Sequence, residues 1–158
     1  MNKLLPFILL SVVTTNLQAA EKQLACGTRT KSSVAAACVD MTRANISGAQ
    51  LAGRDLKGIK LLRGKLRETN LSNSNLQNAD LQFTDLYKAR LRNANLTNAN
   101  LREAKLYKAD LSGADLRGTN LRKARLTGTQ LGGAIFNDQT ILPFSKEKAL
   151  ALGMIYQP

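Results

Sequence analysis

The side chains in this sequence that could take part in chemistry are mostly lysine, arginine and tyrosine. The chain has no His, so it lacks an imidazole base. Most of its aspartates belong to a five-residue repeat, which accounts for them structurally, and the sequence has no glycine-rich phosphate loop. The sequence therefore predicts a protein that is not an enzyme and has no cofactor.

The two cysteines, Cys26 and Cys38, lie close together near the start of the chain. In an exported protein two cysteines most economically form one disulfide. Two thiols without any His do not suggest a metal site. A second interpretation makes Cys26 a lipidated cysteine, because residues 24–27 loosely resemble a lipoprotein site. The charges of Glu21 and Lys22 oppose it, and we expect the disulfide.

The first nineteen residues have the composition of a secretory signal peptide. Lys3 supplies a positive charge, residues 4–13 are almost continuously apolar, and small residues follow at Ala19 and Ala20. An apolar run of about ten residues is too short to span a bilayer. We expect cleavage after Ala19 and a mature protein without a membrane span, located in the bacterial periplasm or secreted.

The formal net charge is +12, which is high for a chain of this length. Such an excess of positive charge indicates an anionic neighbour, such as nucleic acid, an anionic lipid surface or an acidic polymer. The alternative is that the charge only keeps the surface solvated.

An apolar residue recurs at every fifth position from Met41 to Phe136, and most of these residues are Leu. A small residue usually stands two positions earlier, and Asp or Asn often stands between them. An α-helix would spread this pattern around its whole surface, because five residues turn the chain by about 140° beyond one full turn. A flat strand would turn every second Leu to the wrong face. The period instead predicts a chain that bends once per pentad and stacks into a solenoid with the Leu and small residues inside.

Pentads such as Ala79–Phe83 (ADLQF), Ala94–Asn98 (ANLTN) and Ala114–Gly118 (ADLRG) resemble the A(D/N)LXX unit of the pentapeptide-repeat family. The resemblance covers residues 39–138. It implies an all-β fold, a right-handed quadrilateral β-helix with four pentads per coil and about five coils. Residues 20–38 would then form an N-terminal cap segment and residues 139–158 a C-terminal cap, each with a short helix.

Arg54 and Ile59 depart from the repeat, because they occupy positions that should be small and inward. We expect local distortion there, or an Arg54 side chain that reaches solvent. At the C-terminal end Ser145 is a good N-cap for a helix that stops at Gly153. Phe144, Leu150, Met154 and Ile155 are expected to cover the last coil. In the family such segments also join subunits, so a homodimer through this cap is a further expectation.

With four pentads per coil, the outward positions divide among four faces, each named by the apolar residues at its pentad centres. Face one (centres 41, 61, 81, 101 and 121) and face two (centres 46, 66, 86, 106 and 126) together sum to +7, whereas faces three and four sum to zero. The candidate binding residues all lie on face two: Lys65, Arg67, Tyr87, Lys88, Lys105, Tyr107, Lys108 and Arg125. Basic side chains around aromatic rings suit an anionic or sugar-bearing polymer. The alternative is a solvated face with the two Tyr packed as a ladder, and Arg90 and Arg92 on face three are expected to matter less.

Two classes of function stay open. The first is an exported structural or protein-interaction scaffold with an unknown protein partner. The second is a binder of an anionic polymer or surface at the cell envelope. The family resemblance also suggests DNA mimicry, in which a pentapeptide-repeat protein binds a type II topoisomerase and confers quinolone resistance. Such mimics need an acidic surface, so the basic faces and the expected export count against this third class.

Overall fold

The structure is a computed structural model that describes residues 40–158. The expected signal peptide, the N-terminal cap segment and the Cys26–Cys38 disulfide lie outside the described residues.

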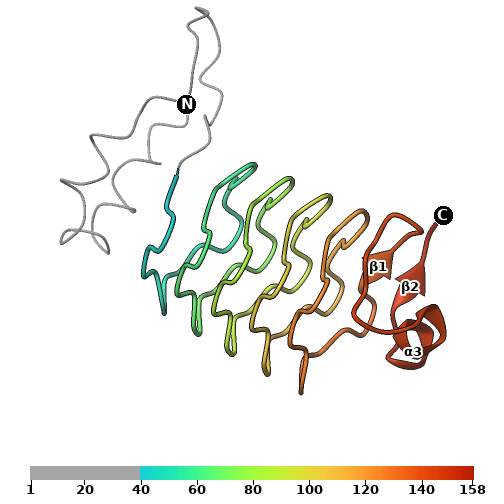
Figure 1. Ribbon diagram of the computed structural model, residues 1–158. Helices are drawn as coiled ribbons and strands as arrows, with labels where there is room; N and C mark the ends of the chain where they lie inside the picture. The colour runs from blue at the N-terminus through green and yellow to red at the C-terminus, as the bar shows by residue number, and fades with distance from the viewer. Residues whose placement is uncertain (1–39) are drawn as a thin grey trace, which may run out of the picture.

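The described chain winds into coils of twenty residues that stack along one axis (Figure 1). Isolated parallel β-bridges join each pentad to the pentad twenty residues later, from Asp40 with Lys60 to Asp115 with Ile135. Each coil therefore contains four pentads, as the family resemblance implies. The named elements of the described residues lie at the C-terminal end: β1 (Ile135–Phe136), α3 (Lys146–Ala151) and β2 (Ile155–Tyr156).

The middle pentads that carry Asp or Asn before the central Leu satisfy their five backbone N–H groups in the same way. Three of the five donate to carbonyl groups of the neighbouring coils, one closes a turn within the pentad, and one donates to the Asp or Asn side chain. In the pentad around Leu96 these bonds are Asn95 N–H to Ser74 O (2.9 Å), Leu96 N–H to Asp115 O (2.8 Å), Thr97 N–H to Asn95 Oδ1 (3.0 Å), Asn98 N–H to Arg117 O (2.9 Å) and Ala99 N–H to Leu96 O (2.9 Å). The Asp or Asn position of the repeat thus has a structural purpose, since its side chain accepts the bond that no neighbouring coil can accept.

The second residue after each Leu adopts a left-handed backbone conformation. Its φ is positive in pentad after pentad, as at Asn98 (φ 57°) and Gly118 (φ 68°). A turn closed over two central residues, the second with positive φ, favours Gly or Asn at that residue. Of the two positions after the Leu, only the second therefore requires the left-handed conformation.

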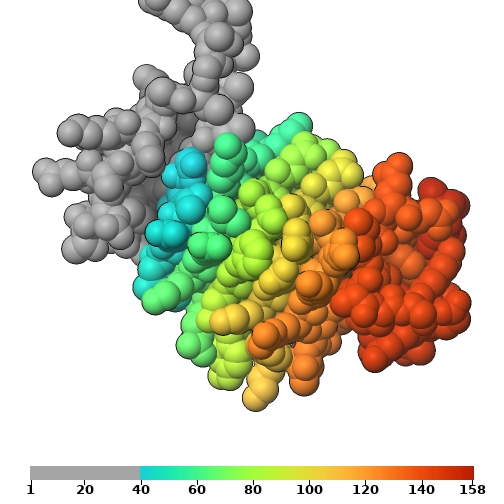
Figure 2. Space-filling view, in the orientation of Figure 1, coloured from blue at the N-terminus to red at the C-terminus, as the bar shows by residue number. Residues whose placement is uncertain are grey.

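The core is a column of Leu side chains alternating with small residues. From Leu61 to Leu116 every central Leu is buried, and Ala fills most of the inward positions beside them. Where Thr or Ser replaces Ala, its hydroxyl donates to a backbone carbonyl, as from Thr119 to Leu96 O at 2.7 Å. The buried hydroxyl therefore keeps a partner, which avoids the cost of an unsatisfied polar group. The close succession of the coils leaves no gap in the surface view (Figure 2).

The inter-coil hydrogen bonds continue through both departures from the repeat, so the expected local distortion is absent there. Ile59 is buried in the core with 7% of its surface exposed. Arg54 is only half-buried, and its carbonyl still accepts the bond from Asn75 N–H at 2.9 Å. Both residues lie in the first described coil, where Met41, Ala44 and Leu51 are also only partly buried.

The helix expected after Ser145 is present. The Ser145 hydroxyl accepts a bond from Lys148 N–H, and α3 begins at Lys146. The expected packing at this end is partly wrong, because Leu150 and Ile155 are about half exposed, at 49% and 48%. Ala149 and Met154 are buried, and β2 pairs in parallel with β1 to extend the ladder beyond the last pentad. On so short a helix only one face meets the coil, and Ala149 occupies it.

Replacing Leu96 by Ala should lower the free energy of unfolding by about 2–5 kcal/mol, because it empties a fully enclosed position. Replacing its outward neighbour Thr97 by Ala should cost about 0.5 kcal/mol or less, since that position has ordinary backbone geometry. Urea denaturation of both variants measures the difference. Equal losses at the two sites would contradict the five-residue coil.

Candidate functional site

The structure brings the predicted residues of face two together. Consecutive β-bridges place Lys65, Asp85, Lys105 and Arg125 in one column, one residue per coil. Neighbouring strands of a sheet lie about 4.8 Å apart, so these side chains start from closely spaced backbone positions. Lys65, Lys105 and Arg125 are exposed. The single acidic member, Asp85, lies between Lys65 and Lys105.

Both tyrosines of face two interact with an arginine. The Arg67 guanidinium lies over the Tyr87 ring at 4.7 Å from its centroid, and Lys88 Nζ lies 5.4 Å from the same centroid. Arg125 Nη1 donates to the Tyr107 hydroxyl at 3.3 Å. Exposed contacts between a cation and a ring are worth about 0.5–1 kcal/mol each. The arginines thus partly occupy the tyrosines, and the rings help to hold cationic side chains in place.

Asp85 reduces the charge of face two only locally. Its Oδ1 accepts the turn bond from Tyr87 N–H at 3.2 Å, and its Oδ2 lies 3.9 Å from Arg67 Nε. The carboxylate therefore serves the turn in the way that the repeat requires. Within residues 40–158, no carboxylate oxygen lies within 4 Å of the side-chain nitrogens of Lys65, Lys105 or Arg125.

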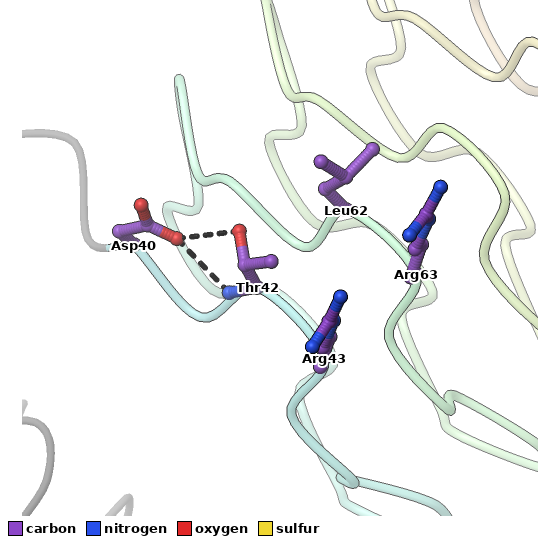
Figure 3. Close-up of a pocket in the computed structure, with 5 residues that line it drawn as sticks. All are labelled: Asp40, Thr42, Arg43, Leu62 and Arg63. Carbon is purple, nitrogen blue, oxygen red and sulfur yellow. Dashed lines mark hydrogen bonds between the residues drawn. The ribbon is translucent and has the colours of Figure 1, made fainter.

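Figure 3 shows what the repeat normally places at the position before the central apolar residue. Asp40 Oδ1 accepts bonds from the Thr42 hydroxyl at 2.7 Å and from Thr42 N–H at 3.0 Å. These two bonds hold the pKa of Asp40 below its usual value. The same view contains a hollow bounded by Arg43, Leu62 and Arg63.

Face two breaks this rule at three of its five pentads. Lys65, Lys105 and Arg125 occupy the Asp or Asn position and cannot accept the turn bond. Lys88 and Lys108 occupy the left-handed position, with φ of 55° and 57°, where Gly or Asn would be less strained. Each forgone bond or strained residue costs about 1 kcal/mol. The fold therefore does not explain the cations of face two and would be more stable without several of them.

Arg90 and Arg92, which were assigned to face three, lie beside Lys88 and Lys108. All four line one hollow of about 410 Å³, together with Asn70, Ser72, Ala89 and Asp110. The hollow lies at the corner between faces two and three. The sum of charges for each face assigned Lys88 and Lys108 to face two and the two arginines to face three. The corner nevertheless brings all four side chains to one hollow. The signal was present in the sequence, since residues 88–92 read Lys-Ala-Arg-Leu-Arg with the two apolar residues inward.

No helix of residues 40–158 is long and apolar enough to cross a membrane. The same residues contain no group of three or more acidic, His or Cys side chains that could hold a metal ion.

Comparisons with known proteins agree on the fold. The family profile described as pentapeptide repeats, with eight copies, matches residues 55–93, 65–102 and 99–138. The pentapeptide-repeat protein Rfr23 of the cyanobacterium Cyanothece 51142 is 37% identical, with a TM-score of 0.53 over 65% of this chain and 63% of that one. HetL of Nostoc sp. strain PCC 7120, a pentapeptide-repeat protein involved in heterocyst differentiation regulation, is 34% identical, with a TM-score of 0.62 over 65% of this chain and 44% of that one. The chain thus matches less than two thirds of the length of either protein. No curated protein matches the sequence. The four-sided coil is the right-handed quadrilateral β-helix of these neighbours.

Replacing Lys105 by Asn should raise the free energy of unfolding by about 0.5–1.5 kcal/mol, because Asn restores an acceptor for Tyr107 N–H. Lys105→Gln removes the same charge with a longer side chain and controls for relieved repulsion. Thermal and urea denaturation should show a larger gain for Asn than for Gln. An equal gain in both would mean that charge, and not the turn bond, limits stability here.

Proposed function

Because the chain belongs to the pentapeptide-repeat family, we propose that it is an exported, non-enzymatic scaffold that binds a partner through the outer faces of its β-helix. The observation behind this proposal is the complete use of the interior. The inward side chains form the core, and most backbone donors of the middle pentads are bonded within the solenoid. Only outward side chains remain to meet another molecule. The absence of His from the sequence supports a function without acid–base catalysis.

Export and the ends of the solenoid form part of this proposal. The composition of residues 1–19 supports a signal peptide and a periplasmic or secreted protein. A Cys26–Cys38 disulfide would then stabilise residues 20–38 as an N-terminal cap. Between the ends we propose about five coils over residues 39–138. The buried Ala149 and Met154 support residues 139–158 as the C-terminal cap, and the exposed Leu150 and Ile155 are consistent with a homodimer through it.

The second candidate function is binding of an anionic polymer or surface at the cell envelope through face two. The observation that favours it is the cost of its cations. Lys65, Lys105 and Arg125 each stand where Asp or Asn would complete the turn, so the fold gains nothing from their charge. Positive side chains retained at a cost to stability indicate selection for a contact with negative charge.

DNA mimicry toward a topoisomerase remains disfavoured. A mimic of the phosphate backbone needs an array of carboxylates, whereas faces one and two sum to +7. Export would also separate the protein from the chromosome.

The triple variant Lys65→Asn, Lys105→Asn and Arg125→Asn should bind heparin, phosphatidylglycerol vesicles and duplex DNA more weakly than the unmodified chain. Each Asn also completes a turn, so unfolding cannot explain a loss. For DNA, the slope of log K against log salt should fall by about 0.9 for each phosphate contact removed. Sedimentation and fluorescence titration across a salt series measure both quantities.

The matched control is Lys60→Asn, Arg122→Gln and Lys123→Asn, which removes three cations from face one. It should retain most of the affinity. Equal losses in the two triple variants would show that only net charge matters. If none of the three probes binds at low salt, the polymer-binding function is wrong and the scaffold proposal stands alone.

Expression of the full-length chain in a bacterium tests the export proposal. The protein recovered from the periplasm or medium should begin at Ala20, and its two cysteines should resist thiol labelling until a reductant is added. Mass spectrometry reads both results. An intact Met1 in the cytoplasm, two reactive thiols, or a lipid on Cys26 would each overturn the corresponding part.

A further inference from the structure

We propose that the corner between faces two and three is a discrete binding site for a phosphate monoester group, and we name it the corner site. It consists of Asn70, Ser72, Lys88, Arg90, Arg92 and Lys108. The inference deepens the polymer-binding function and rests on it only in assuming that the basic surface meets an anion. It adds the chemical group that is bound, a phosphate monoester, and the residues that bind it.

The corner site forms a short groove along the solenoid axis. A second hollow of about 340 Å³ adjoins the first and shares Asn70, Lys88 and Arg90 with it. Lys88 and Lys108 occupy equivalent positions of successive coils on one wall, and Asn70 and Arg90 are bridged neighbours on the other. The chain at Ala89, whose side chain points into the core, lies between these walls and lines the hollow.

The charges of the corner site fit an anion with more than one negative charge. Asp110 lines the same hollow, and its Oδ2 lies 3.7 Å from Arg92 Nε. The charges of this pair offset each other, and the Arg92 side chain stays largely exposed. In the described part of the chain, no carboxylate oxygen lies within 4 Å of a side-chain nitrogen of Lys88, Arg90 or Lys108. Glu68 lines the second hollow and occupies the position of Lys88 in the preceding coil, so it offsets part of the charge at that end.

Three cations around one small hollow match a phosphate monoester better than the alternatives. A monoester carries about −1.5 to −2 charge at neutral pH, with three strong acceptor oxygens. A carboxylate, a sulfate ester or a phosphodiester carries a single charge. The Arg90 guanidinium offers a planar fork for two oxygens, the two lysines act as point charges on the opposite wall, and Ser72 adds a hydroxyl.

The cations of the corner site also depart from what the repeat prefers. Arg90 stands at the Asp or Asn position, so Arg92 N–H lacks the turn acceptor that Asp85 gives Tyr87. Lys88 and Lys108 have positive φ. Residues other than Gly or Asn also occupy the left-handed position elsewhere, as at Arg63 and Glu103. What is particular to the corner site is that three cations meet around one hollow, which indicates an anionic ligand.

The test is a titration of the full-length chain with methyl phosphate and methyl sulfate, followed by amide chemical shifts in NMR spectra. The two probes share their shape and differ in charge at pH 7.5. Methyl phosphate should shift the amides of residues 70–72 and 88–92 and should bind at least about tenfold more tightly than methyl sulfate. Equal affinity for the two probes, or shifts spread over all four faces, would overturn the proposal.

The variant Lys88→Asn with Arg90→Asn removes two cations and gives each position the residue that the repeat prefers, so the fold should be retained or stabilised. Its affinity for methyl phosphate should fall by about tenfold or more, because charge-assisted bonds are lost. The matched control is Lys60→Asn with Lys123→Asn, which replaces two cations by Asn at the equivalent positions of face one. It should change the affinity by less than about twofold. Equal losses in both double variants would contradict the corner site.

Vesicles of phosphatidylcholine with phosphatidic acid carry the same group on a lipid. Binding of either probe that depends on Lys88 and Arg90 supports the corner site, and the comparison identifies the carrier. If neither methyl phosphate nor phosphatidic acid binds, the corner site is wrong. Heparin and DNA can still bind face two in that case, so this failure is distinct from failure of the polymer-binding function.

Discussion

The structure depends on the requirement that every backbone N–H group find a partner once per pentad. A coil that stacks on its neighbours gives three of the five groups a carbonyl partner, and a turn gives one more. The remaining group points away from both neighbouring coils, and the Asp or Asn side chain accepts it, as Asn95 does for Thr97. The most regular polar residue of the repeat is therefore explained by backbone bonding and needs no ligand.

The same requirement separates structural polar residues from residues that the fold does not explain. Asp85 serves its turn even within the most basic face, whereas Lys65 and Lys105 in the same column serve none. In a solenoid each outward position has the same local geometry in every coil, so a departure at one coil can be compared directly with its neighbours. The free-energy cost of replacing Asp or Asn marks a cation as one that the fold does not explain. Net charge alone does not make this distinction.

The solenoid also explains why its surface is suited to recognition. Its outward side chains stand on a rigid backbone at regular spacing, and the hollows between them are shallow. Cations placed on both sides of a corner can converge on one group, whereas cations along a flat face meet a ligand side by side. Cations of faces two and three can therefore converge on one anionic group at their shared corner, which the cations of a single flat face cannot do.

The sequence by itself determined the five-residue period, the inward Leu and Ala positions, the helix after Ser145 and the excess of charge on faces one and two, because each depends only on the order of residue types along the chain. The tertiary structure decided the rest. It showed that the second position after each Leu is left-handed, that Ala149 and not Leu150 meets the last coil, and that Arg90 and Arg92 lie beside Lys88 and Lys108. These features depend on the direction in which the chain bends between pentads. A count of residues by face cannot recover that direction. It assigns the residues on the two sides of a corner to separate faces, whereas the bend of the chain brings them together.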